Sequence, residues 1–275
     1  MRSPTWILAA LVLVAPSLAR ADPPRGVTEL PWDAAVDAPL VTFAGVAWII
    51  SELEKPSLAP ASCRWCGVDA FDASARRALV WSKPALASTL SDVAVFGLAP
   101  VSAIGLNALA AWHDGHPENL GEDALIVLEA SFLAMDVDQA VKYAAGRPRP
   151  YAHFANAAVL SAHPDPHDAN LSFFSGHTTA AFAFAVSSGT VASMRGYRWA
   201  PWVWAQGLGI AVGSGYLRLA ADRHYVTDVL AGAAVAAAMG WAVPWLLHRP
   251  GRGERRASIA VVPMNGAGLG VVGLW

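Results

Sequence analysis

Long apolar stretches are the feature that most restricts the fold of this chain. Residues 89–112 and 226–247 are each long enough to cross a bilayer as a helix, and each contains few charges. Of all 275 residues, 55% are hydrophobic and 15% charged, so the chain is more apolar than an ordinary soluble domain. The net charge of −2 gives no reason to expect nucleic acid as a partner.

Further segments show the spacing of apolar residues that is typical of helices. Together with the first two they predict an all-α bundle of about six apolar helices embedded in a membrane. Several tryptophans stand near the ends of these segments, as they do at membrane interfaces, although they could equally fill a core. Residues 54–88 are loop-like, with one short helix near 73–82. The additional helices are expected at 36–53, 122–145, 178–194 and 201–216.

Both ends of the chain differ from the apolar middle. Residues 1–21 resemble a cleaved export signal, because Arg2 is followed by an apolar run and then by the small-x-small triplet Ala19-Arg20-Ala21. An uncleaved anchor is the alternative. Residues 22–256 then form the helical domain. Residues 257–275 form a short tail that resembles a β-hairpin around Asn265-Gly266.

The two cysteines, Cys63 and Cys66, favour a small disulfide in an oxidising compartment. A zinc site would need four ligands, and no second C-x-x-C is present. A redox motif would be expected beside a βαβ pattern, which the sequence lacks. The run from His163 to Asp168 also contains possible metal ligands, but its prolines hold no fixed geometry, so a solvated loop is preferred.

Three polar clusters interrupt the apolar pattern at the ends of predicted helices. They read K-Y-A-A-G-R-P-R-P at 142–150, S-F-F-S-G-H at 172–177 and R-L-A-A-D-R-H-Y-V-T-D at 218–228. Charged groups in apolar surroundings are costly unless they have a partner or a function.

The residue types in these clusters suit a phosphate group. Lys142, Arg149 and Arg218 are cations that could share one anion, and the fork of arginine fits phosphate oxygens. The Gly176 amide stands at a helix N-terminus, which attracts anions. His224 lies four residues before Asp228, so we expect the carboxylate to hold one ring nitrogen and leave the other as a nucleophile. Taken singly, each residue is more often a helix-end charge or a satisfied core residue; their combination favours phosphoryl transfer.

The order K-x6-R-P, S-G-H and R-x5-H-x3-D resembles the type 2 phosphatidic acid phosphatase superfamily, which also contains class A acid phosphatases and vanadium haloperoxidases. The resemblance implies that Ser175 and Gly176 complete a phosphate cradle made by the three cations. It implies that His224 is the nucleophile aligned by Asp228, and that His177 protonates the leaving group. No metal and no other cofactor would be required.

Two positions depart from the family pattern: Phe174 stands where proline is usual, and Leu217 where serine is usual. Neither removes a catalytic group, although loss of the serine weakens one phosphate contact. The function expected first is hydrolysis of a lipid phosphate or diphosphate, such as phosphatidate, phosphatidylglycerol phosphate, undecaprenyl diphosphate or lipid A. The alternatives are a soluble periplasmic acid phosphatase of broad specificity, a vanadate-dependent haloperoxidase, and a non-enzymatic membrane protein.

The predicted location is a bacterial inner membrane with the site facing the periplasm. Arg195, Arg198 and the basic segment 249–256 would then be cytoplasmic, as the positive-inside rule requires. Basic residues within 55–83 would be periplasmic, against that rule, so a soluble periplasmic domain remains the alternative. We also expect residues 36–53 to lie along the surface or dip in without crossing, because a crossing would put the site inside.

Overall fold

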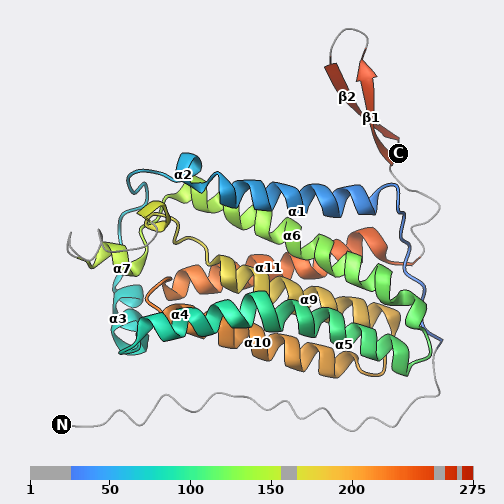
Figure 1. The fold of residues 1–275 in the computed structure, drawn as a ribbon, viewed down its shortest axis with the longest axis horizontal. Coiled ribbons are helices and arrows are strands. Elements are labelled where there is room, and N and C mark those ends of the chain that lie inside the picture. The colour runs from blue at the N-terminus through green and yellow to red at the C-terminus, as the bar shows by residue number, and fades with distance from the viewer. Residues whose placement is uncertain (1–25, 156–165, 251–257, 265–267, 275) are drawn as a thin grey trace.

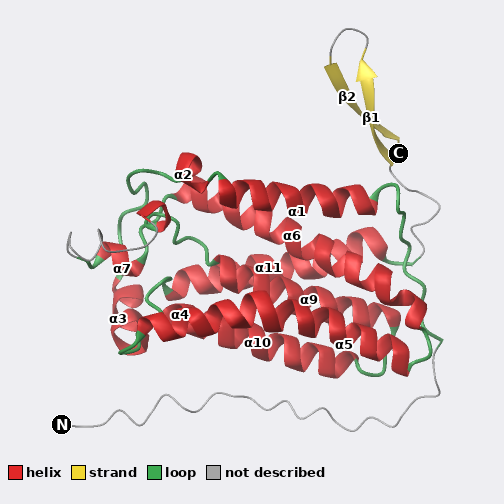
Figure 2. Ribbon diagram, in the orientation of Figure 1, coloured by secondary structure: helices red, strands yellow, loops and turns green. Residues whose placement is uncertain are grey.

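The computed structural model describes residues 26–155, 166–250, 258–264 and 268–274, and its main body is a bundle of long helices packed lengthwise (Figure 1). The short helices at 55–58, 70–79 and 150–153 lie at one end of the bundle (Figure 2). The export signal predicted at 1–21, His163 and the hairpin turn lie outside the described residues. The elements are α1 (Asp37–Leu53), α2 (Lys55–Leu58), α3 (Ala70–Leu79), α4 (Pro84–Val93), η1 (Ala94–Leu98), α5 (Ala99–His113), η2 (Pro117–Asn119), α6 (Leu120–Ala145), α7 (Pro150–His153), η3 (Pro166–Asp168), α9 (Gly176–Arg195), α10 (Ala200–Ala220), α11 (Val226–His248), β1 (Ser258–Met264) and β2 (Gly268–Leu274).

The predicted all-α bundle is confirmed, with apolar helices close to the expected bounds. The largest difference concerns the helix expected at 89–112. It begins earlier, at Pro84, because proline at the first helical position loses no hydrogen bond there. Its middle is the π-helical turn η1, which no sequence pattern indicated. Such turns are frequent at functional sites.

Helix α9 forms the centre of the bundle and packs against α6, α10 and α11. Its sequence is rich in Ala, Ser and Gly, and these small side chains let the neighbouring helices approach closely. Gly189 faces the ring of Trp204, and a Cβ atom there would overlap the ring. At Gly240 on α11, a Cβ would lie 3.0 Å from Val186 Cβ. Close packing of α9 therefore fixes the positions of the helices that carry the polar clusters.

Local signals end or begin the helices at the places where the clusters stand. Helix α6 ends at Gly146, whose φ of 55° is the left-handed conformation that glycine adopts easily. Helix α9 begins after Ser175, whose side chain accepts a hydrogen bond from the Thr178 amide. Arg218 lies in the last turn of α10. All three predicted clusters consequently meet at the end of the bundle where α2, α3 and α7 lie (Figure 1).

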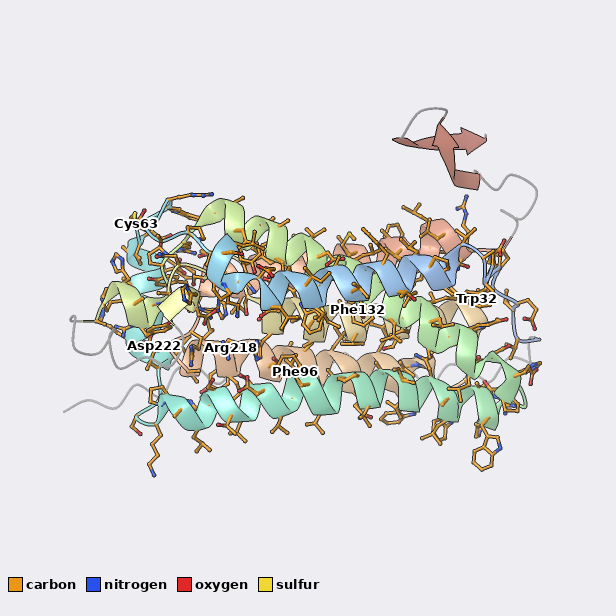
Figure 3. All side chains as sticks on the ribbon, turned by 45° about the horizontal axis from the view of Figure 1, so that its top comes forward. Trp32, Cys63, Phe96, Phe132, Arg218 and Asp222 are labelled. Carbon is orange, nitrogen blue, oxygen red and sulfur yellow. A yellow bond between two sulfur atoms is a disulfide. The ribbon has the colours of Figure 1, made fainter. Side chains whose placement is uncertain are left out.

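The outer faces of the long helices expose large apolar side chains (Figure 3). Phe43 on α1 is 73% exposed, Val101 on α5 72% and Trp202 on α10 69%. Two described helices, Pro84–His113 and Val226–His248, are long and apolar enough to cross a membrane. Helix α1 runs lengthwise along α6 (Figure 1), and the expectation that residues 36–53 lie along the membrane surface or dip in without crossing stays a prediction.

The two remaining sequence-based features appear outside the helical core. Strands β1 and β2 pair antiparallel, with Ser258 opposite Leu274 and Met264 opposite Gly268, so the expected C-terminal hairpin is confirmed. Cys63 and Cys66 form a disulfide with a Cα–Cα distance of 5.4 Å. It lies in the loop between α2 and α3, where Arg64 donates a hydrogen bond to the Tyr143 carbonyl and so attaches the loop to the end of α6.

Candidate active site

A pocket of about 420 Å³ opens at the end of the bundle where the three clusters meet. Six of the eight residues predicted for catalysis and phosphate binding line it, and Ser175 and Asp228 lie behind its wall. The six are Lys142, Arg149, Gly176, His177, Arg218 and His224. The chain therefore brings together groups from α6, α9, α10 and two loops, as a site for one anion requires.

His224 lies at the base of the pocket, and the side chain is 3% exposed. Its Nδ1 is 2.8 Å from the Ser172 carbonyl oxygen, which can only accept, so Nδ1 carries the ring proton. Its Nε2 is 2.9 Å from Arg149 Nη1 and accepts a hydrogen bond from it. Burial, and then the Arg149 and Arg218 cations, hold the pKa of His224 well below 6.5. The ring thus presents an unprotonated nitrogen to the pocket.

The role expected of Asp228 needs a correction. Its Oδ2 is 3.8 Å from His224 Nδ1, which is too long for a hydrogen bond. The four-residue spacing is misleading here, because His224 stands outside α11 and residues four apart share a face only within a helix. Asp228 instead accepts from the Ser172 hydroxyl at 2.6 Å and from the Tyr225 amide at 2.9 Å. It acts on His224 through Ser172, whose carbonyl holds the ring.

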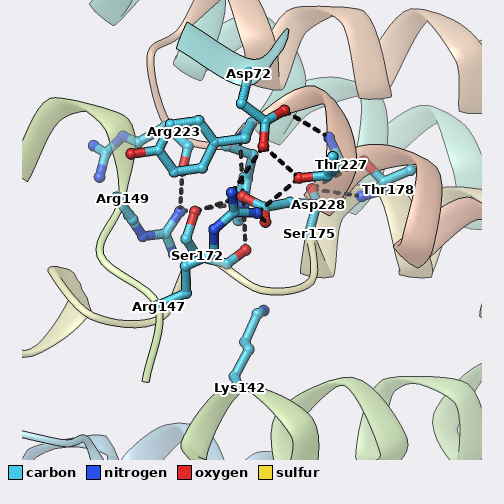
Figure 4. Close-up of polar contacts among 12 residues, drawn as sticks. Asp72, Lys142, Arg147, Arg149, Ser172, Ser175, Thr178, Arg223, Thr227 and Asp228 are labelled. Carbon is cyan, nitrogen blue, oxygen red and sulfur yellow. Dashed lines mark hydrogen bonds and ion pairs between the residues drawn. The ribbon is translucent and has the colours of Figure 1, made fainter. Parts of the chain in front are cut away.

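Arg147 is the residue that the sequence interpretation missed most clearly, although it belongs to the same R-P-R-P run as Arg149. It is 1% exposed and forms ion pairs with Asp228 and with Asp72 on α3 (Figure 4). Its guanidinium also lies 4.3 Å from the ring centres of both Trp65 and Tyr225. Arg147 therefore supports the loop that carries His224 from outside the pocket, and Arg149 lines the pocket itself.

Lys142 and Gly176 lie next to each other on facing helices. Lys142 Nζ is 2.6 Å from Asp138 Oδ2, one helical turn away on α6. A Cβ atom at position 176 would overlap this ammonium group, so glycine lets Lys142 lie directly against the start of α9. Ser175 differs from expectation: its hydroxyl is buried and accepts from Thr178, so it caps α9 and does not line the pocket.

His177 has a partner that the motifs did not indicate. Its Nε2 is 2.7 Å from Asp92 Oδ1, on α4 immediately before the π-helical turn. Phe96 in that turn contacts the ring edge-on at 5.3 Å between centres. In the sequence, Asp92 is simply a charged residue within the apolar segment 89–112. Its position gives the predicted proton donor a carboxylate that stabilises the imidazolium form.

A second acid, Asp168, lies across the pocket from Asp92. Its Oδ1 accepts from Arg149 Nη2 at 2.7 Å, and its Oδ2 is 3.5 Å from Arg223 Nη1. Burial alone would raise the pKa of Asp168, but Arg149 and then Lys55 outweigh that effect and lower the pKa to about 2. Asp168 is therefore a permanent anion that holds Arg149 at the pocket wall.

Comparison with known proteins agrees with this geometry. Residues 123–252 match the family model described as the PAP2 superfamily. Over this stretch, which is just under half of the chain, the sequence is similar to the PAP2 superfamily. The match includes all eight residues predicted for catalysis and phosphate binding.

Asp72 and Asp92 lie before the PAP2 match. One similar solved structure is the first transmembrane PAP2 type phosphatidylglycerolphosphate phosphatase from Bacillus subtilis, with a TM-score of 0.46 and 16% sequence identity, over 76% of this chain and 94% of that one. No curated protein matches the sequence.

Proposed function

We propose that this protein hydrolyses the phosphate ester or diphosphate of a membrane lipid through a phosphohistidine intermediate on His224. The observation that carries the proposal is the unprotonated Nε2 of His224, which faces the pocket 2.9 Å from Arg149 Nη1. Lys142 and Arg218 line the same pocket. A phosphoryl group attached at Nε2 would place its oxygens against these cations.

The proposed reaction has two steps. In the first, Nε2 of His224 attacks phosphorus, the bond from phosphorus to the leaving oxygen breaks, and His177 gives that oxygen a proton. In the second, His177 accepts a proton from water, the water oxygen attacks phosphorus, and the P–N bond breaks. Inorganic phosphate leaves and Nε2 is regenerated. Asp92 stabilises the protonated form of His177 that exists before the first step and after the second.

The lining of the pocket supports a lipid as the substrate. Besides charged and polar side chains, one part of the wall is apolar and includes Trp48, Val95, Phe96, Met135 and Ala180. These residues come from α1, the π-helical turn, α6 and α9, and the first three of these elements also expose large apolar side chains on the outside of the bundle. A headgroup phosphate among the cations would direct its acyl chains along this wall. The proposed location is a bacterial inner membrane, with the pocket facing the periplasm.

A lipid panel tests the proposal. Purified protein in detergent is assayed for phosphate release from phosphatidate, phosphatidylglycerol phosphate, undecaprenyl diphosphate and p-nitrophenyl phosphate, beside His224→Ala. We expect release from a lipid, no turnover by the variant, and an acid-labile phosphoprotein trapped in the wild type only. Activity confined to the soluble ester, with release of the protein by osmotic shock without detergent, would favour a soluble acid phosphatase instead.

A further inference from the structure

A second group of polar side chains lies at the other end of the bundle, away from the phosphate pocket. It consists of Asp37 in the first turn of α1, Glu129 on α6 and His248 at the end of α11. One nitrogen or oxygen atom from each lies within 4.8 Å of the other two. Glu129 and Lys142 are on the same helix, and a rise of 1.5 Å per residue puts them about 20 Å apart. The group is therefore separate from the phosphate site.

The ring of His248 is oriented so that its free nitrogen faces a carboxylate. Nδ1 is 2.9 Å from the Pro31 carbonyl oxygen, so Nδ1 carries the proton and donates it. Nε2 is then left with a lone pair, 3.1 Å from Glu129 Oε2. Two electron-pair acceptors at this distance need either a proton or a metal ion between them.

A proton alone leaves part of the group unsatisfied. Glu129 is 0% exposed, and its other oxygen, Oε1, is buried without a hydrogen-bond partner. A protonated His248 would pair with Oε2 of Glu129 only. The two carboxylates carry two negative charges and the imidazolium carries one positive charge, so the group would keep a net charge of −1. An uncompensated buried charge is costly. A divalent ion bound by neutral imidazole and two carboxylates brings the group to zero net charge and can use both oxygens of Glu129.

We propose that Asp37, Glu129 and His248 bind a divalent transition-metal ion of the Zn²⁺ class. Zinc binds imidazole nitrogen and carboxylate oxygen at about 2.0–2.2 Å, so ligands of one ion lie on the order of 3–4 Å from each other. The imidazole disfavours Mg²⁺ and Ca²⁺, which take oxygen ligands. Metal-binding histidines usually donate their other ring N–H to a carbonyl or carboxylate, as His248 does to Pro31.

The remaining contacts also orient the proposed ligands. The Asp33 amide donates to Asp37 Oδ2 at 2.6 Å, which orients that carboxylate. Asp37 is half-buried, so the site can be reached from solvent. The three ligands come from the start of α1, the middle of α6 and the end of α11. An ion held by them would attach the first long helix and the last one to the same point of the bundle.

Metal content and thermal unfolding test the inference. The full chain is purified without a polyhistidine tag, exchanged into metal-free buffer, and titrated with Zn²⁺ while bound metal is measured by mass spectrometry. The variants are Glu129→Gln, His248→Gln and the half-buried Asp37→Asn, with His113→Gln, an exposed histidine at the end of α5, as the matched control.

We expect about one Zn²⁺ per chain in the wild type and the control, and at least a tenfold weaker affinity in each variant. Zn²⁺ should raise the unfolding temperature of the wild type and control but not of the variants, and a chelator should reverse the rise. The inference is overturned if the wild type binds no more Zn²⁺ than Asp37→Asn, or if Zn²⁺ leaves its unfolding temperature unchanged. A buried ion pair of His248 with Glu129 would then account for the contacts. If Glu129→Gln and His248→Gln do not fold, the comparison of the wild type with Asp37→Asn still tests whether the site binds Zn²⁺.

Discussion

Gly176 offers the sharpest test of how the phosphate cradle is built. Adding one methyl group by Gly176→Ala places a Cβ atom over the Lys142 ammonium and 2.9 Å from Asp138 Oδ2. Real Cβ atoms do not approach other atoms so closely, so the lysine must move. Both contacts are with the ends of side chains, and α9 itself need not shift. The substitution therefore displaces one cation of the pocket and leaves the backbone of the cradle intact.

The size of the effect follows from the role of Lys142. A displacement on the order of 1 Å in a group that positions the reacting phosphate costs about 10²-fold in rate. Stability should change little, because alanine favours a helix over glycine by about 1 kcal/mol and offsets part of the crowding. We expect Gly176→Ala to lower kcat/KM for phosphate release about 10²-fold and to unfold close to the wild-type temperature.

The control is Gly213→Ala on α10, where an added Cβ meets nothing within 4 Å. Phosphate release and thermal unfolding are measured for both variants in the same detergent. Gly213→Ala should keep wild-type kcat/KM. If Gly176→Ala also keeps it, the proximity of Lys142 to the start of α9 has no bearing on catalysis and the proposed cradle is wrong.

Three further predictions concern the groups around His224 and His177. Because burial and neighbouring cations hold the pKa of His224 well below 6.5, its ring stays neutral as pH falls through 6.5, and kcat/KM should show no acidic decline near that pH; a pH–rate profile that declines there contradicts the assignment. Asp92→Asn should lower kcat/KM on the order of 10²-fold for substrates with poor leaving groups, and much less for p-nitrophenyl phosphate. An equal loss of kcat/KM across a series of leaving groups would mean that Asp92 does not act through His177. Arg147→Met leaves two buried carboxylates unpaired and should lower the free energy of unfolding by about 3–5 kcal/mol, whereas the exposed Arg77→Met should change it by less than about 0.5 kcal/mol, as denaturant titration would show.

The sequence was sufficient for the helices and for most of the charged side chains that meet in the pocket. Apolar periodicity marked the helices because each buries a face against its neighbours. The three motifs placed Lys142, Arg149, Arg218, His177 and His224 together, and the structure brings all of them to one pocket. The positions of the motifs along the chain were informative because each motif stands at a helix end. Successive long helices run in opposite directions, so the end of one helix and the start of the next lie on the same side of the bundle.

The supporting residues were not predictable, for physical reasons that differ from one to the next. Asp92 touches His177 across two helices, and no local pattern reports such a contact. Asp72 pairs with Arg147 from a segment interpreted as loop-like. The Ser172 carbonyl holds the His224 ring through the backbone, which carries no residue-type signal. Spacing rules describe groups within one element, whereas this site is oriented by contacts between elements.

The lengthwise packing of α1 also constrains how the chain can sit in a membrane. The long helices alternate in direction, so the start of α1 and the end of α11 lie at the end of the bundle opposite the pocket (Figure 1). If all of them cross, a periplasmic pocket requires a cytoplasmic start of α1. A cleaved export signal would deliver that start to the periplasm, so these two sequence-based predictions cannot both hold.

The basic residues divide on this point: those that follow α11 favour a periplasmic pocket, and those within 55–83 oppose it. Arginines in the segment 249–256 follow the end of α11, whereas Arg147, Arg149 and Arg76 at the pocket end are all paired with acids. We therefore expect Ser57→Cys, at the pocket end, to react with an impermeant maleimide in intact cells, and Glu118→Cys, at the opposite end, to react only after lysis. Mass spectrometry of the purified chain should find residues 1–21 still attached. The reverse labelling pattern, with residues 1–21 removed, would place the phosphate pocket in the cytoplasm.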